Sequence, residues 1–177
     1  GRCRGAVRRR VVRMKVLHLT GDREDAGGIL SVLRNLHDAS RVMEMRHVVW
    51  VHRDFRQRRE PLLELRTGNH CCAESAQHWR MAWRSLLSWP GLKRLLTTES
   101  FDLVHAHTRG TLLLGTAVAS RLGRRVVYTN HNYARRKEFY QRLAQKPNLY
   151  TVLLTPNMGR YYDIAPAPPR VSIVSAC

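Results

Sequence analysis

Short apolar runs alternate along the chain with segments of helical periodicity. The apolar runs have the length and β-branched content of strands, and we predict strands at residues 15–20, 47–52, 103–107, 126–131, 150–154 and 171–174. Apolar residues at helical spacing predict helices at residues 29–39, 74–98, 111–122, 133–145 and 157–162. Because strands that alternate with helices are typical of βα units, we predict an α/β fold, a doubly wound, mostly parallel sheet with helices on both faces.

The segment between the second predicted strand and the second predicted helix has the weakest pattern. Residues 62–65 are a candidate short strand, and Thr67, Gly68 and Asn69 have the composition of a turn. Residues 53–75 otherwise have no firm assignment. The helix that follows contains Pro90 and Gly91, so we expect it to break there.

An amphipathic stripe runs along this long helical segment. Trp79, Trp83, Leu86 and Leu87 fall on one face, and arginines fall off it. We expect the stripe to pack on the sheet. The alternative is that this Trp- and Arg-rich segment makes peripheral contact with an anionic surface, at the inner face of a membrane.

Length and composition limit the class of protein. The 177 residues suffice for one hydrophobic core, and a content of 44% hydrophobic and 25% charged residues is typical of a globular domain. No apolar run is long enough to span a bilayer. We therefore predict a single domain at residues 14–177. It follows a basic arm at residues 1–13, whose six arginines and weak hydrophobic pattern predict disorder.

The formal net charge of +18 departs furthest from average composition. Such a charge favours a polyanionic partner, and basic clusters lie at residues 8–10, 56–59 and 135–137. Because only four of the basic residues are lysines, codon composition accounts for part of the arginine excess. A basic nucleic-acid-binding α/β protein is therefore the alternative function, and the less favoured one.

The cysteines indicate the redox compartment. Four cysteines are too few and too unevenly spaced for a disulfide framework, which favours a reducing, cytoplasmic compartment. His70, Cys71 and Cys72 are residue types that ligate metals, but no second ligand pair follows at the spacing of a zinc finger. We interpret these cysteines as loop thiols and predict no metal site.

Glycines and polar residues gather at the predicted carboxyl ends of the strands, the edge where open parallel sheets bind ligands. Gly27 and Gly28 follow the first strand, where the lack of side chains lets a ligand approach the main chain and the amides of the next helix. His105 and His107 are two residues apart and point to the same face of their strand. Thr129 and His131 repeat this arrangement on the following strand, so we expect His107 and His131 to meet at one rim. Each feature alone fits a turn or a structural histidine, and together they favour a site for a polar ligand.

Three sequence blocks occur in a fixed order. They are KVLHL at residues 15–19 with the following Gly27 and Gly28, FDLVHAH at residues 101–107, and VYTNH at residues 127–131. In order and spacing they resemble the amino-terminal half of GT-B glycosyltransferases of family 4, and the likeness spans residues 14–174. It implies a single Rossmann-like, acceptor-binding domain, half of a GT-B fold. The enzyme would transfer a sugar from a nucleotide-sugar donor with retention of configuration, without a bound metal or other cofactor.

The resemblance also implies roles for individual residues. His131 matches a histidine that lies near the transferred sugar or the acceptor, and it is the candidate catalytic residue. The residues implied to contact the substrate or the donor phosphates are Gly27, Gly28, His107, Arg109 and Thr129.

Such enzymes hold the donor with a second Rossmann-like domain, and nothing in this sequence matches that domain. Retaining transfer requires stabilisation of the departing phosphate in a cleft closed against water. We therefore expect this chain to be inactive alone and to need a complementing carboxy-terminal domain. The expected partners are the nucleotide-sugar donor and a glycan, lipid or small-molecule acceptor.

Overall fold

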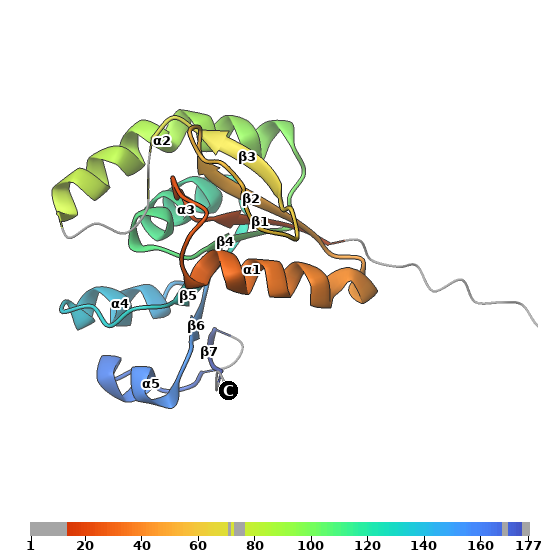
Figure 1. The fold of residues 1–177 in the computed structure, drawn as a ribbon. Helices are drawn as coiled ribbons and strands as arrows, with labels where there is room; N and C mark the ends of the chain where they lie inside the picture. Colours follow the sequence, from red (N-terminus) through yellow and green to blue (C-terminus); the bar gives the residue numbers. More distant parts are fainter. Residues whose placement is uncertain (1–13, 71, 73–76, 168–169, 175–177) are drawn as a thin grey trace, which may run out of the picture.

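A seven-stranded parallel sheet forms the centre of the molecule (Figure 1). The structure is a computed structural model that describes residues 14–70, 72, 77–167 and 170–174, so the predicted basic arm lies outside the described residues. The strands are β1 (Lys15–Leu19), β2 (Arg46–His52), β3 (Glu64–Gly68), β4 (Leu103–Ala106), β5 (Arg125–Asn130), β6 (Leu149–Leu153) and β7 (Val171–Ile173). Their order in the sheet is β3-β2-β1-β4-β5-β6-β7, so the direction of winding reverses between β1 and β4.

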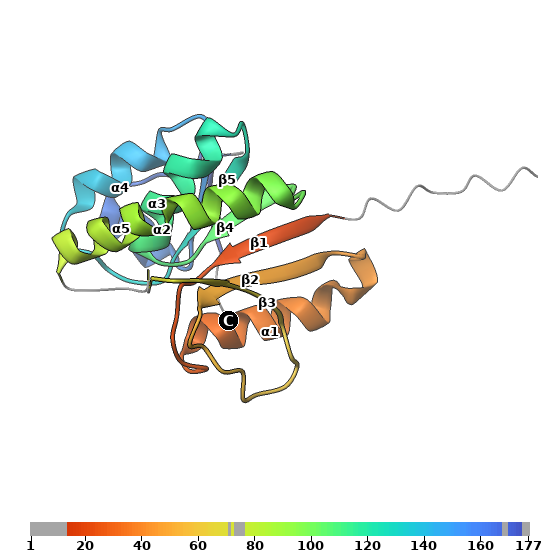
Figure 2. The same ribbon diagram turned by 90° about the horizontal axis from the view of Figure 1, so that it is seen from above.

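Helices cover both faces of this sheet, as the sequence predicts. On one face lie α1 (Gly28–Ala39) and the short helix η1 (Ser40–Met43) that continues it. On the opposite face lie α2 (His78–Thr98), α3 (Arg109–Arg121), α4 (Lys137–Ala144) and α5 (Pro156–Tyr162), as the view from above makes clear (Figure 2). The fold is a Rossmann-like, doubly wound α/β domain.

Alternating side chains of the strands divide the hydrophobic core into two parts. Leu17, Leu19 and Val104 point toward α2 and α3 and belong to the larger cluster. Val49 and Val51 point the other way, into a smaller cluster with the apolar stripe of α1. The period-2 alternation therefore leaves Val16 and His18 of β1 on the α1 face.

The region with the weakest sequence pattern contains the additional strand, β3. Residues 62–65 were the candidate strand, but the strand begins at Glu64, and Thr67 and Gly68 belong to it rather than to a turn. The alternation is hidden because arginine and glutamate side chains of this edge strand form ion pairs: Arg66 binds Glu99 and Glu64 binds Arg46. Gly68 is required at its position because the indole ring of Trp50 occupies the space of a side chain.

The long helix corrects two further predictions. It does not break at Pro90 and Gly91, which lie inside α2 on its exposed side, where water can bind the carbonyl group that the proline leaves free. The tryptophan stripe also does not pack on the sheet, since Trp79 is 68% and Trp83 57% exposed.

A different face of α2 is buried, and it carries small residues in its first half. Met81, Ser85 and Ser88 point inward, and Ser85 donates a hydrogen bond to the carbonyl oxygen of Gly110 on α3. A side chain on Gly110 would meet the backbone of Cys72 and the side chain of Met81, so the two helices approach each other over small groups. Close approach to α3 therefore accounts for the serines in the first half of the buried face, whereas Leu92 and Leu96 join the hydrophobic core in its second half.

Two other helices begin at different residues than predicted. Helix α3 starts at Arg109, because Thr108 is its N-cap and forms a capping box with Thr111. Helix α4 starts only at Lys137, and residues 133–136 form the loop that leads from β5 to it. In the described part of the chain, no helix has both the length and the hydrophobicity to cross a membrane.

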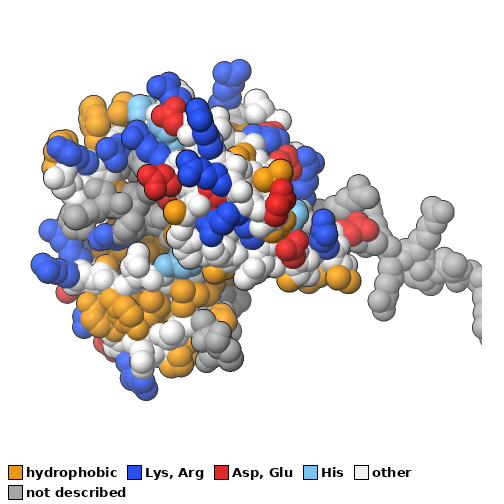
Figure 3. All heavy atoms as spheres, viewed as in Figure 1, with side chains coloured by type: hydrophobic (Ala, Val, Ile, Leu, Met, Phe, Trp, Pro, Cys, Tyr) orange, Lys and Arg blue, Asp and Glu red, His pale blue; other side chains and the backbone are white. Residues whose placement is uncertain are grey.

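Basic side chains do not form one continuous stripe on the face seen in Figure 3, where Asp and Glu side chains lie between them. Several arginines are bound by acidic residues. Asp25 pairs with Arg34 and Arg59, and Glu99 pairs with Arg66. Part of the positive charge in the described part of the chain is therefore paired within the fold.

Candidate functional site

Histidine side chains meet under the carboxyl ends of β1, β4 and β5. The sheet register pairs His18 of β1 with His105 of β4, which puts both on the same face. His107 follows the last residue of β4, and His131 follows the last residue of β5. In open α/β sheets this edge, at the reversal of winding, is where ligands bind.

The imidazoles form a row of close contacts. Nδ1 of His107 lies 3.2 Å from Nε2 of His131, as expected from the alternation of their two strands. Nε2 of His107 lies 3.1 Å from Nδ1 of His18. Nε2 of His18 in turn lies 2.8 Å from Nδ1 of His47, the second residue of β2. Nε2 of His47 lies 2.7 Å from the hydroxyl group of Ser40, at the end of α1.

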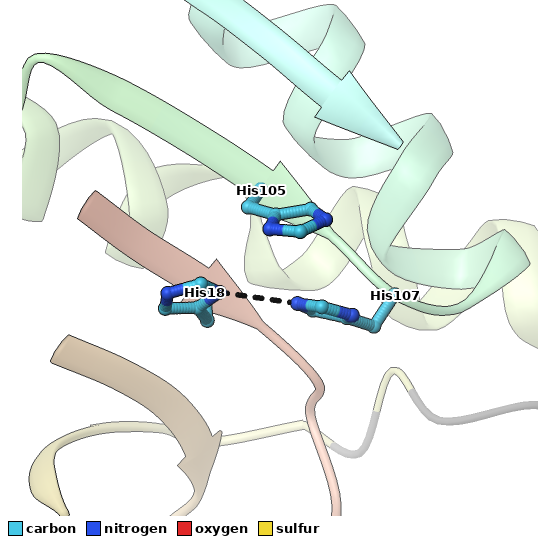
Figure 4. A group of neighbouring side chains, drawn as sticks. All are labelled: His18, His105 and His107. Carbon is cyan, nitrogen blue, oxygen red and sulfur yellow. Dashed lines mark hydrogen bonds between the residues drawn. The ribbon is translucent and has the colours of Figure 1, made fainter. Parts of the chain in front are cut away.

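His105 packs beside this row rather than within it. Its ring packs against that of His107, with 4.0 Å between the ring centroids and a tilt of 35° between the ring planes (Figure 4). Its Nε2 lies 2.8 Å from the hydroxyl oxygen of Thr129. The predicted site residue Thr129 is thus buried and hydrogen-bonded to a histidine. We refer to the five imidazoles as the histidine cluster: His18, His47, His105, His107 and His131.

The environment keeps the cluster neutral. Burial, together with repulsion from neighbouring histidines, lowers the pKa of His105 to about 3. Burial, followed by repulsion from nearby histidines, holds the pKa of His18 and of His107 well below the ordinary value. Burial also lowers the pKa of His47 and of His131. At neutral pH each imidazole therefore has one N–H donor and one acceptor nitrogen.

His18, His105 and His107 are close enough to be tested as metal ligands, since one nitrogen of each lies within 4.8 Å of the others. Two imidazole nitrogens on one tetrahedral zinc ion would lie about 3.3 Å apart, with both lone pairs directed at the ion. Here both nitrogens of His18 and both of His107 are used by other imidazoles, and the ring of His105 packs against that of His107. The geometry fits a hydrogen-bonded cluster better than a metal site.

Gly27 and Gly28 lie at the same edge of the sheet, where α1 begins. Gly27 is the N-cap, has a φ of 90° and makes no side-chain cap hydrogen bond. Both glycines are exposed, and a Cβ at either would meet nothing within 4 Å. The first amides of α1 are thus open to an anionic group.

The loop before these glycines is held by Asp25. Its side chain is fully buried and accepts hydrogen bonds from the backbone amides of Arg58 and Arg59 and from the guanidinium group of Arg34. Burial alone would raise the pKa of Asp25, but these donors lower it to about 2. A cavity of about 340 Å³ adjoins the loop, and Arg23, Asp54, Arg56 and Arg58 are among its lining residues.

The predicted site residue Arg109 borders a cavity between α2, α3 and α4. It lies in the first turn of α3 and lines an apolar cavity of about 250 Å³ with Met81, Leu113 and Phe139. Of the residues discussed as metal ligands, Cys71 lies outside the described residues, and Cys72 is a buried thiol 3.2 Å from the hydroxyl group of Ser88.

Sequence reasoning missed part of this site. His18 and His47 are buried within apolar strands, and only the register of β1 with β2 and β4 brings them to His107. Asp22 directly follows the β1 edge, and burial raises its pKa to about 6, partly opposed by a hydrogen bond with Thr20. Asn130 is buried beside His131, and its side-chain nitrogen has no partner within the described residues. The sequence signal that could have found His18 and His47 is the presence of a polar residue within an otherwise apolar strand.

Comparisons with known proteins identify the family and the fold. Residues 26–165 match the family described as Glycosyltransferase Family 4. The fold is similar to that of sucrose-phosphate synthase from Thermosynechococcus elongatus, with a TM-score of 0.67 and 10% sequence identity. The alignment covers 91% of this chain and 47% of that protein, so the chain spans about half the length of the structure it matches. No curated protein matches the sequence. The family match covers most of the chain, from the glycine loop past β6, and the chain therefore belongs to glycosyltransferase family 4.

Proposed function

We propose that this chain is the acceptor-side domain of a glycosyltransferase that moves a sugar from a nucleotide-sugar donor to an acceptor with retention of configuration. The observation that carries the proposal is the contact of His107 with His131 at the carboxyl ends of β4 and β5, next to the reversal of winding. Family membership supports the reaction class, and the position of the imidazoles supports the location of the site. Because the family match indicates a glycosyltransferase, and basic side chains on the face seen in Figure 3 have acidic ones between them, we favour this function over nucleic-acid binding.

His131 is the candidate catalytic residue in this proposal. It is half-buried at the rim, so one side of its ring can face a sugar hydroxyl group while the other side is held by His107. Gly27 and Gly28 would present the open amides of α1 to the donor diphosphate across the cleft. The reaction then needs no metal, since backbone amides and the second domain would stabilise the departing phosphate.

Transfer in this scheme depends on a donor-binding domain opposite the carboxyl edge of the sheet. The matched synthase structure is about twice as long as the aligned part, which supports this requirement. We therefore expect residues 14–177 to bind substrates weakly and to transfer sugar only with a complementing domain.

Calorimetry with nucleotide sugars and candidate acceptors tests this function. Saturable binding to the chain, alone or with a complementing domain, is expected, and His131→Asn should weaken it at least tenfold. His70→Gln, a histidine outside the cluster, is the matched control and should bind as the unaltered chain does. If no nucleotide sugar or acceptor bound under either condition, the proposed function would be wrong.

The exposed face of α2 supports a lipid surface as a further partner. Trp79, Trp83 and Leu86 line an open apolar groove of about 450 Å³ with Ala82. Helix α2 carries several basic residues and no acidic one. Aromatic and leucine side chains flanked by arginines bind the interface of an anionic bilayer, so we propose that α2 docks the domain on such a surface, where a lipid-linked acceptor would be within reach.

Vesicle sedimentation distinguishes this docking from nonspecific adhesion. Binding should increase with the fraction of anionic lipid and should fall severalfold in a Trp79→Ser, Trp83→Ser double variant. Val42→Ser removes a 92% exposed side chain on the other face of the sheet and serves as the control. Equal binding by all three proteins, or binding that does not depend on anionic lipid, would contradict the proposal.

A further inference from the structure

A continuous row of hydrogen-bonded groups leads from the end of α1 to the candidate catalytic histidine. It runs from Ser40 through His47, His18 and His107 to His131, with heavy-atom distances of 2.7, 2.8, 3.1 and 3.2 Å. Ser40 and the first three histidines are buried, whereas His131 is at the rim. The row therefore connects the interior of the domain with the site.

Every link in the row has the same polarity. His47, His18 and His107 each use Nε2 toward Ser40 and Nδ1 toward the site, and His131 also uses Nε2 toward the interior. A neutral imidazole carries one N–H, so it donates on one side and accepts on the other. The four tautomers are consequently coupled, and either all carry the proton on Nε2 or all carry it on Nδ1.

Ser40 decides between these two states. Its hydroxyl group has one proton, and it donates that proton to the carbonyl oxygen of His37 at 3.2 Å. It can then only accept from His47, whose Nε2 must carry a hydrogen. If Ser40 instead donated to His47, the bond to the carbonyl oxygen of His37 would be lost. The first arrangement forms one hydrogen bond more, and buried groups favour the state with more bonds.

We propose that Ser40 holds His47, His18, His107 and His131 in the Nε2–H tautomer, so that His131 presents Nδ1 to the site as a hydrogen-bond acceptor. Ser40, His47, His18 and His107 are positioning residues in this arrangement. No described residue forms a hydrogen bond with Nδ1 of His131, and this nitrogen is thus available to a ligand.

The proposal defines the chemistry of what His131 binds. A ring nitrogen with a lone pair accepts a hydrogen bond from a hydroxyl group and can remove its proton, whereas an N–H group can do neither. The ligand group at this position is therefore a hydroxyl donor, such as a sugar or acceptor hydroxyl, rather than a carboxylate or phosphate oxygen. The identity of this ligand group rests on the proposed function, whereas the assignment of the Nε2–H tautomers does not.

Imidazole tautomers are measured directly by long-range ¹H–¹⁵N correlation NMR on the ¹⁵N-labelled full chain. The sample contains EDTA to remove bound metal, is free of substrate, and is held at pH 7.5. We expect the Nε2–H pattern for all four imidazoles of the row. An Nδ1–H pattern at His131, or an imidazolium pattern at any of the four, would overturn the proposal. Because no ligand is present, failure of the glycosyltransferase function leaves this result unaffected.

Variants of Ser40 test whether its hydroxyl group decides which ring nitrogen of each histidine in the row carries the hydrogen. Ser40→Ala removes the acceptor for His47, and at least part of the His131 signal should then change to the Nδ1–H pattern. Ser40→Thr, which keeps the hydroxyl group, should restore the original pattern. Thr129→Val cuts only the bond to His105 beside the row and should leave His131 unchanged. An unchanged His131 pattern in Ser40→Ala would refute the role of Ser40, and if that variant does not fold, the spectrum of the unaltered chain still decides the direction.

Discussion

Gly68 lies directly against the indole ring of Trp50, so close that a methyl group at this position would overlap the ring. The two residues stand on neighbouring strands, and Trp50 is among the largest fully buried side chains of the core. Gly68→Ala forces either the tryptophan or the edge strand β3 to move. We expect a loss of about 1–3 kcal/mol in the free energy of unfolding, measured by urea denaturation.

Gly91→Ala is the matched control for this substitution. Gly91 lies in α2 on its exposed side, and a Cβ there would meet nothing within 4 Å. Alanine should stabilise the helix at this position by about 0.5–1 kcal/mol. If both variants changed stability in the same direction, the proposed overlap with Trp50 would not be what constrains Gly68.

The contact of Gly68 with Trp50 shows why the sequence pattern predicts some strands and misses others. Buried parallel strands contain apolar runs such as Val48 to Val51, and their alternation with helices predicts the sheet. β3 is an edge strand whose polar side chains form ion pairs and whose glycine accommodates a tryptophan from another strand. Such a strand owes its place to partners distant in the sequence, so its local pattern indicates a turn.

The candidate site likewise contains histidines that the sequence pattern predicts and histidines that it misses. His105 and His107 could be assigned to one face because they are two residues apart, and His131 because it ends the following strand. His18 and His47 join them through a strand register that no local spacing specifies. Likewise, the tryptophan stripe of α2 has the spacing of a buried face, but Ser85 and Ser88 are buried because they let α2 approach its neighbours closely. Packing distance between elements is not contained in a hydrophobic pattern.

The buried, neutral histidine cluster makes stability depend on pH. Each member has a folded-state pKa below the unfolded value, about 6.5, so the unfolded state binds more protons as the pH falls through that value. Their stabilising contribution is fully present above pH 6.5 and is lost as the pH falls toward the folded pKa, which for His105 is about 3. We expect the free energy of unfolding to fall between pH 6.5 and 4.5, by up to about 1.4 kcal/mol per pH unit for each histidine. Asp22 opposes the decrease in part, because its raised pKa of about 6 favours the folded state at low pH.

Urea denaturation at a series of pH values measures this dependence. His105→Gln removes one titrating group and should reduce the slope by about 1.4 kcal/mol per pH unit in the lower half of the range. His70→Gln lies outside the cluster and should reproduce the slope of the unaltered chain. A free energy of unfolding that stays constant between pH 8 and 5 would show that the cluster is not neutral and buried in solution.

Asp25 anchors the loop that carries Gly27 and Gly28, and its removal should affect both stability and the site. Asp25→Asn leaves the guanidinium group of Arg34 buried without its counter-ion, which sits 2.8 Å away in the native pair. Breaking a buried ion pair in this way costs about 3–5 kcal/mol. Asp38→Asn, at an exposed position of α1, should cost far less and is the control.

Hydrogen exchange and pH dependence separate this effect from a general loss of stability. In Asp25→Asn, the amides of residues 26–28 should lose protection more than the amides of β4, because the bonds from Asp25 to the backbone of Arg58 and Arg59 weaken. Since the pKa of Asp25 is lowered to about 2, its contribution is present above the unfolded value, about 3.9, and is lost only as the pH falls through 2. The difference in stability between the variant and the unaltered chain should therefore be constant from pH 8 to 5, a range in which the contribution of the histidine cluster begins to fall. A difference that disappeared within this range would mean that Asp25 is already protonated there, and that the glycine loop is held by the neutral acid rather than by an ion pair.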